Sequence, residues 1–130
     1  MSTNAMIRVE GVKYAELYKH WDGYPDATLE WLVNFNEDFR INRGNDPSYK
    51  FAQLIRSSTK IDSSPYTGWG VYEFGAVAGQ QFEYFLRADG SVEVLDVYDG
   101  TTTIHKKAET KEAHQARVER ACRNLIAGPE

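Results

Sequence analysis

The sequence predicts an α+β domain in which an N-terminal hairpin and a C-terminal meander form one antiparallel sheet, with two central helices and a C-terminal helix packed on it. Three observations predict this class. Strand-like runs lie in both halves of the chain, two helix-like stretches separate them, and glycine turns punctuate the second set of strands. A chain of 130 residues, 42% hydrophobic and 26% charged, suits a single domain spanning residues 1–130.

The N-terminal hairpin is predicted from two alternating runs. Residues 6–10 alternate weakly, Gly11 interrupts them, and residues 12–19 resume the alternation. Two runs of this kind around a glycine are typical of a β-hairpin. Residues 1–5 are small and polar, and they could be a frayed end, residues that are not native, or the start of an edge strand.

The first helix is predicted from about Pro25 to Arg43. Proline is tolerated at the first helical position, and Asp26 suits the positive end of the helix dipole. Gly44 stands where a left-handed residue often ends a helix. The apolar stripe of this helix consists of Leu29, Leu32, Val33, Phe35 and Phe39.

A second helix is predicted to begin at Asp46-Pro47, because an acidic residue caps a helix end and proline fits the first turn. It fades at residues 57–59. Its apolar side consists of Tyr49, Phe51, Ala52 and Ile55. The stretch that follows, up to Gly68, is rich in Ser and Thr and contains Pro65, which predicts a long surface loop.

The second half of the chain predicts the meander. Short runs rich in β-branched and aromatic residues are separated by glycine-containing turns, among them Asp89-Gly90 and Asp99-Gly100. Asp-Gly between alternating runs is a strong hairpin signal. The predicted strands are residues 69–74, 81–87, 92–98 and 101–105.

The last predicted element is a helix over residues 106–127, ended by Gly128-Pro129. Its charged first half indicates a solvated face, with docking of a partner as the alternative. Cys122 lies in the apolar stripe and is expected to be a small buried residue rather than a reactive thiol. The stripe consists of Val118, Ala121, Cys122, Leu125 and Ile126.

The composition argues against several function classes. A net charge of −4 at pH 7 argues against general nucleic-acid binding, which needs a concentrated basic face. The single cysteine excludes an internal disulfide, and no apolar run is long enough to span a membrane, so a cytoplasmic protein is expected. No cofactor is expected, because no phosphate-binding glycine loop, nucleophile elbow or Cys-x-x-Cys motif occurs.

The densest group of interactive side chains is the elbow, residues 19–25, between the hairpin and the first helix. If the strand persists to Asp22, the side chains of His20 and Asp22 share one face, and the carboxylate would orient the imidazole as a general base or a metal ligand. Alternatively, Asp22 caps its own turn and His20 ties the loop to the strand. A third metal ligand is not evident in the local spacing, so no metal is expected.

Aromatic residues of the elbow supply the candidate binding residues. Trp21 and Tyr24 could form a stacking platform for a base, a sugar or a peptide proline. Alternatively, the pair anchors the core, and the alternation then predicts that Trp21 is buried and Tyr24 lies on the surface. Trp69, between Gly68 and Gly70, could pack on the elbow or serve as an ordinary core residue.

The hexapeptide His20-Trp21-Asp22-Gly23-Tyr24-Pro25, preceded by Leu17-Tyr18, resembles a signature of small uncharacterised proteins of phages and other prokaryotic mobile or genomic islands. Residues 3–7, 69–72, 83–85 and 89–90 are similar to the same group. The resemblance implies that residues 3–7 are native. The group has no established activity, so the resemblance implies an origin and no mechanism.

Aromatic richness without a catalytic constellation favours a small accessory or interaction domain. Its contact surface is expected in the elbow and in the loop over residues 57–68. The expected partner is an unidentified protein or small ligand, and self-association into a homodimer is left open. The alternative is a small hydrolase-like enzyme with His20 as general base, oriented by Asp22.

Overall fold

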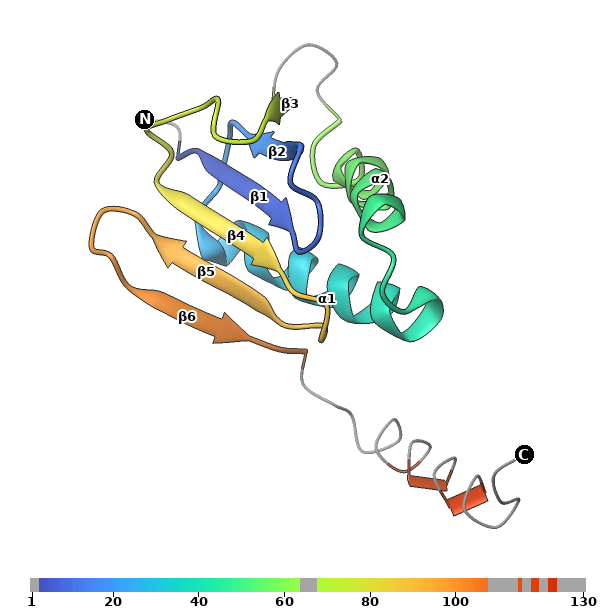
Figure 1. Cartoon of the computed structure of the whole chain (residues 1–130). Helices are drawn as coiled ribbons and strands as arrows, with labels where there is room; N and C mark the ends of the chain where they lie inside the picture. Colours follow the sequence, from blue (N-terminus) through green and yellow to red (C-terminus); the bar gives the residue numbers. More distant parts are fainter. Residues whose placement is uncertain (1–2, 64–67, 108–114, 116–117, 120–121, 124–130) are drawn as a thin grey trace.

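The computed structural model describes residues 3–63, 68–107, 115, 118–119 and 122–123 of the chain (Figure 1). The order of elements is two strands, two helices and four strands. Their bounds are β1 Ala5–Val9, β2 Ala15–Lys19, α1 Pro25–Arg43, α2 Pro47–Ser58, β3 Trp69–Glu73, β4 Phe82–Leu86, β5 Val92–Asp96 and β6 Thr102–His105. The α+β class and the two central helices therefore agree with the sequence.

The six strands form one mixed sheet in the order β3-β2-β1-β4-β5-β6. The prediction of an antiparallel sheet is wrong, because β1 runs parallel to β4, with Ile7 opposite Tyr84. The other four strand pairs are antiparallel. The chain reaches β4 only after two helices and β3, so no tight turn forces β4 to run against β1.

The position of β3 is a second correction. The sequence predicts it as the first strand of the meander, whereas it lies at the far edge of the sheet and pairs with β2, Val71 standing opposite Leu17. Only β4, β5 and β6 form a meander. Both β3 and β4 run parallel to β1, so residues 74–81 return along the length of the sheet before β4 begins.

The predicted C-terminal helix packed on the sheet is also wrong for the part of it that the structure describes. All described residues of that stretch are exposed, namely Lys106, Lys107, Gln115, Val118, Glu119, Cys122 and Arg123. A helix contributes to a core only when its apolar stripe is buried, and here Cys122 and Val118 are not. The remaining members of the stripe, Ala121, Leu125 and Ile126, lie outside the described residues.

Both helices pack on one core with the sheet, and in Figure 1 α1 runs behind the strands while α2 lies to their right. Alternation sends every second strand residue to one face of the sheet, where it meets the apolar stripes of the helices. The hydrophobic core consists of Ala5, Ile7, Val9, Val12, Leu17, Leu32, Phe51, Leu54, Phe82, Tyr84, Leu86, Val92 and Val94.

The helix ends follow the local sequence. Pro25 occupies the first turn of α1, and Gly44 ends the helix with a φ of 75°, a conformation that glycine adopts without steric cost. The Asp46 carboxylate accepts a hydrogen bond from the Tyr49 N–H at 3.4 Å at the start of α2. These signals place both helices as predicted.

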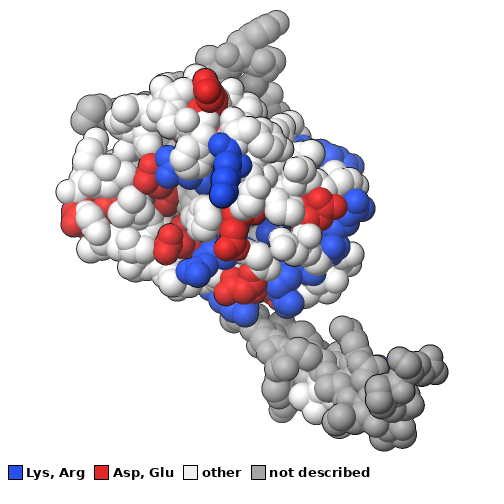
Figure 2. All heavy atoms as spheres, viewed as in Figure 1, with Lys and Arg blue, Asp and Glu red and all other residues white. Residues whose placement is uncertain are grey.

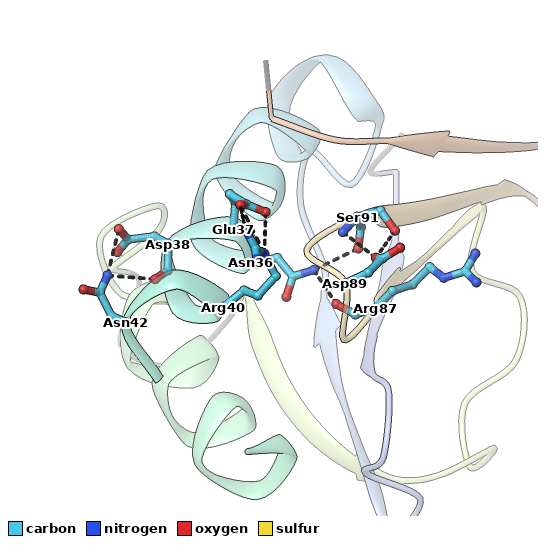
Figure 3. Close-up of polar contacts among 8 residues, drawn as sticks. All are labelled: Asn36, Glu37, Asp38, Arg40, Asn42, Arg87, Asp89 and Ser91. Atoms are coloured by element: carbon cyan, nitrogen blue, oxygen red, sulfur yellow. Dashed lines mark hydrogen bonds and ion pairs between the residues drawn. The ribbon is translucent and has the colours of Figure 1, made fainter. Parts of the chain in front are cut away.

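The turn between β4 and β5 is fastened to α1 by a buried asparagine (Figure 3). The Asn36 Nδ2 donates to the carbonyl oxygens of Arg87 and Ser91, at 2.9 and 2.8 Å. Its Oδ1 accepts from the Lys50 Nζ at 2.8 Å, so the side chain also connects to α2. One amide thereby joins three elements.

The opposite face of the sheet, which we call the open face, carries a partly buried ionic network. The Arg8 guanidinium contacts the fully buried Glu16 carboxylate at 2.6 Å and the Glu83 carboxylate at 2.9 Å. Residues 74–81 lie over this network, because the Phe74 ring covers the guanidinium and Gln80 donates to Glu83.

Figure 2 shows the same view of the molecule with its charges. Basic and acidic side chains are interspersed on this face, and they do not form an extended basic surface. Such a mixed pattern does not favour general binding of nucleic acid on this face.

Candidate functional site

The elbow is a turn rather than an extension of β2. The strand ends at Lys19, and Asp22 has a φ of 51°, a left-handed conformation that is uncommon for a residue with a side chain. The alternation that would place the side chains of His20 and Asp22 on one face therefore stops before it reaches Asp22.

Buried hydrogen bonds hold the middle of the elbow against the sheet. The Gly23 N–H donates to the Thr3 carbonyl at 2.8 Å, and the Gly23 carbonyl accepts from the Tyr84 hydroxyl at 2.6 Å. A Cβ at Gly23 would lie 2.7 Å from the Ala5 Cβ, so only glycine fits. The Thr28 hydroxyl donates to the Asp22 carbonyl at 2.8 Å and ties the elbow to α1. The elbow is thus fixed by its backbone.

His20 and Asp22 are the residues predicted as catalytic, and each has separate surroundings. The His20 Nδ1 lies 2.8 Å from the Tyr18 hydroxyl, and the backbone N–H of His20 donates to the Gly68 carbonyl. Asp22 is exposed. Among the described residues, the side-chain partner of His20 is a phenol and not a carboxylate. The imidazole therefore lacks the orienting acid that the hydrolase alternative requires.

Trp21 is predicted to be buried if it anchors the core, and the structure shows otherwise, since 43% of the residue is exposed. Its ring meets the His20 ring edge to face, with centroids 4.4 Å apart. The Tyr18 ring contacts both the His20 ring and the Tyr72 ring of β3, at 5.8 and 5.6 Å. Tyr72 is itself 40% exposed. We call these four residues, Tyr18, His20, Trp21 and Tyr72, the aromatic surface.

Tyr24 and Trp69 lie outside the aromatic surface. Tyr24 is exposed at the N-terminal cap of α1. Trp69 packs against the core, where its Nε1 donates to the Asp62 carbonyl at 2.8 Å and its ring meets the Trp31 ring at 5.6 Å. Trp69 therefore packs as a core residue, which agrees with the second interpretation given for it.

Lys19, the first residue of the elbow, contacts both Trp21 and Trp69. Its ammonium donates to the Trp21 carbonyl and lies 5.1 Å from the centre of the Trp69 ring. Burial lowers the pKa of Lys19, while the nearby carboxylates of Asp22 and Asp62 act in the opposite direction. An ammonium held in this way positions the Trp21 backbone, and with it the exposed indole.

Sequence reasoning missed Tyr18 and Tyr72 as members of the surface. Alternation along residues 12–19 assigns Tyr18 to one strand face, but it gives no hint of what lies beside it. Tyr72 could not be found, because its contact with Tyr18 depends on the pairing of β3 with β2. The predicted loop over residues 57–68 meets the elbow through Gly68, and residues 64–67 of it lie outside the described part of the chain.

A groove lies away from these residues. A groove of about 750 Å³ between α1 and α2 has acidic residues of α1 on one wall and Arg56 and Lys60 on the other. None of the predicted site residues lines it. Within the described residues, no group of three or more His, Cys, Asp or Glu side chains could hold a metal ion. In the same part of the chain, neither helix has the length and apolar character needed to cross a membrane.

Comparisons with known proteins do not assign the chain to a family. No family model matches it, and neither a curated protein nor a solved structure is significantly similar to it.

Proposed function

We propose that this protein is a small accessory interaction domain, of the phage or mobile-element type that its elbow motif resembles, and that it binds a protein partner through the aromatic surface. The observation that carries the proposal is the chain of ring contacts from Tyr72 through Tyr18 and His20 to Trp21, two members of which are at least 40% exposed.

Two energetic arguments support binding at the aromatic surface. Trp and Tyr present large rigid contact areas at low entropic cost, and they dominate the binding energy of many interfaces. The fixed backbone of the elbow adds preorganisation, because Gly23 and Lys19 hold Trp21 in position before a partner arrives. The hydrolase alternative has no comparable support, since the His20 imidazole bonds to the Tyr18 hydroxyl.

The test is selection of phage-displayed random peptides on the immobilised protein, followed by affinity measurements with the selected peptides. We expect Trp21→Ala and Tyr72→Ala each to weaken binding about ten-fold or more, the usual effect of removing an aromatic anchor. Tyr98→Ala is the matched control, because Tyr98 is also exposed but lies on the turn between β5 and β6, and it should bind like the parent protein.

Two outcomes would contradict the proposal. One is selected peptides that bind the Trp21→Ala and Tyr72→Ala variants as tightly as the parent protein. The other is hydrolysis of chromogenic ester or phosphoester substrates by the parent protein, with the activity lost in His20→Ala and in Asp22→Ala, which would favour the enzyme.

A further inference from the structure

The outer edge of β3 presents backbone groups for pairing with another strand. The His20 N–H donates to the Gly68 carbonyl, and the register continues with Tyr18 opposite Gly70 and Glu16 opposite Tyr72. Hydrogen-bonded and non-bonded pairs alternate in an antiparallel ladder. The N–H and C=O of Trp69 and Val71, and the N–H of Glu73, therefore point away from β2. Among the described residues, these groups have no hydrogen-bond partner.

Within the described residues, this edge is less protected than edges usually are. Proteins guard exposed edges with lysine, proline, bulges or a covering segment. β3 contains neither lysine nor proline, its register with β2 is regular, and 52% of Val71 is exposed. At the opposite edge of the sheet, β6 is followed directly by Lys106 and Lys107.

Acidic groups lie at both ends of β3. Glu73 is its exposed last residue. At its start, the Asp62 carboxylate lies 2.6 Å from the position that a Cβ on Gly68 would take, and Asp22 and Asp62 both act on the buried ammonium of Lys19. A strand lying along β3 would thus meet Glu73 at one end, two carboxylates that share one lysine at the other, and the apolar Val71 in the middle.

The aromatic surface continues this edge. Tyr72 belongs to β3 itself, and the Trp21 Cδ1 lies 3.6 Å from the same position at Gly68. A strand added beside β3 would send alternate side chains to the two faces of the sheet, toward Val71 on one and Tyr72 on the other. Aromatic rings also attract guanidinium and ammonium groups, which agrees with the sign of the local charge.

We infer that the partner of this domain is an extended segment of another protein that adds as a strand to the edge of β3 and carries basic residues on both sides of a short apolar stretch. This mode is β-strand addition, in which backbone hydrogen bonds give affinity and alternate side chains give specificity. The inference rests on the proposed function and names the class of its partner.

The experiment uses a phage-displayed library of random peptides, selected on the full chain, and two proline variants. Val71→Pro removes an outward N–H without removing a bond to β2. Ile104→Pro is the matched control at the opposite edge: Ile104 is also β-branched and 59% exposed, and the bond from the Asp96 N–H to the Thr101 carbonyl places its N–H outward in β6.

We expect apolar residues at every second position of the selected peptides, and an enrichment in Lys and Arg. Val71→Pro should weaken their binding ten-fold or more, whereas Ile104→Pro should leave it within two-fold, as expected when one edge supplies the backbone bonds. A synthetic copy of the tightest peptide should bind ten-fold more weakly when it is methylated on the alternate amide nitrogens that face β3. Hydrogen exchange at the Val71 amide should slow when the unmethylated peptide is added, a readout that needs no variant.

Several results would overturn the inference. They are failure to enrich any peptide, enrichment of acidic peptides, equal binding to Val71→Pro, and equal binding of the methylated copy. A dimer in sedimentation that Val71→Pro converts to monomer would replace the peptide by a second copy of this chain. Peptides that depend on Trp21 and Tyr72 but not on Val71 would overturn the strand while leaving the proposed function standing, and peptides that depend on none of the three would overturn both.

Discussion

At the scale of single residues, Tyr84 connects the core to the elbow. Its ring is fully buried in β4, and its hydroxyl donates to the Gly23 carbonyl and so fastens the elbow to the sheet. Burial raises the pKa of Tyr84 well above its ordinary value. The folded protein therefore holds this phenol in its neutral form in alkali, where the unfolded chain ionises it.

This difference gives a pH-dependent prediction for Tyr84→Phe. At neutral pH we expect the variant to lose about 1–2 kcal/mol of unfolding free energy, because the Gly23 carbonyl is left unpaired. A raised folded-state pKa gives stability that is complete below the unfolded pKa near 10 and is lost as the pH rises above it, by up to about 1.4 kcal/mol per pH unit. The variant lacks this loss, so the difference in unfolding free energy between the two proteins should narrow as the pH rises.

The measurement is urea unfolding of the parent protein and Tyr84→Phe at pH 7, 10 and 11. All other tyrosines are common to both proteins, so their ionisation cancels in the difference. A gap that stays constant or widens over this range would contradict the assignment of a buried neutral phenol.

At the scale of elements, α1 is held to the sheet by polar as well as apolar contacts. Asn36 lies on the buried side of α1 and bonds to both carbonyls of the β4–β5 turn and to the Lys50 ammonium of α2. Burial also lowers the pKa of Lys50, so this ammonium depends on the amide oxygen that faces it. The helix pair and the turn are consequently joined through one side chain.

We expect Asn36→Ala to destabilise the protein by about 3 kcal/mol or more, because a buried ammonium and two buried carbonyls lose their partner. Asn42→Ala is the matched control on the same helix: Asn42 is exposed and bonds to Asp38 within one turn, and its loss should cost less than about 0.5 kcal/mol (Figure 3). Denaturant unfolding of the three proteins is the measurement. Equal losses in the two variants would show that Asn36 does not join the elements.

At the scale of the whole molecule, the connection that joins β3 to β4 crosses the open face of the sheet. Residues 74–81 return across it to bring the chain from β3 at one edge to β4 beside β1. Beneath them, the Arg8 guanidinium pairs with the buried Glu16 and with Glu83, and the Gly75 N–H reaches the second oxygen of Glu16 at 3.4 Å. The ionic network thus links three strands to the connection above them.

We expect Glu16→Ala to cost about 3 kcal/mol, because it leaves a partly buried guanidinium without its closest partner. Replacing Arg8 and Glu16 together with apolar residues, Arg8→Met with Glu16→Leu, should cost less than the single change, since the buried carboxylate and the guanidinium are then both gone and Glu83 keeps its hydrogen bond from Gln80. Glu93→Ala is the control for an exposed pair and should cost less than about 1 kcal/mol. Urea unfolding of the four proteins is the measurement. A double variant with a lower free energy of unfolding than Glu16→Ala would contradict this account.

The sequence by itself determined both helices, the turns at Asp89-Gly90 and Asp99-Gly100, and the position of the elbow, because proline, glycine and capping acids act on the backbone within a few residues. It also identified Trp21 as a candidate binding residue, though its alternation argument would have buried the indole. The turn at Asp22, with its left-handed backbone, is what ends that alternation.

Only the tertiary structure decided the parallel pairing of β1 with β4, the place of β3 at the edge, and the gathering of Tyr18, His20, Trp21 and Tyr72. Strand pairing joins residues far apart in the chain, and a strand's own pattern specifies which face is buried but not which neighbour it takes. The surface proposed for binding exists because β3 pairs with β2. The four residues of the aromatic surface therefore come together through a strand pairing that no local sequence signal encodes.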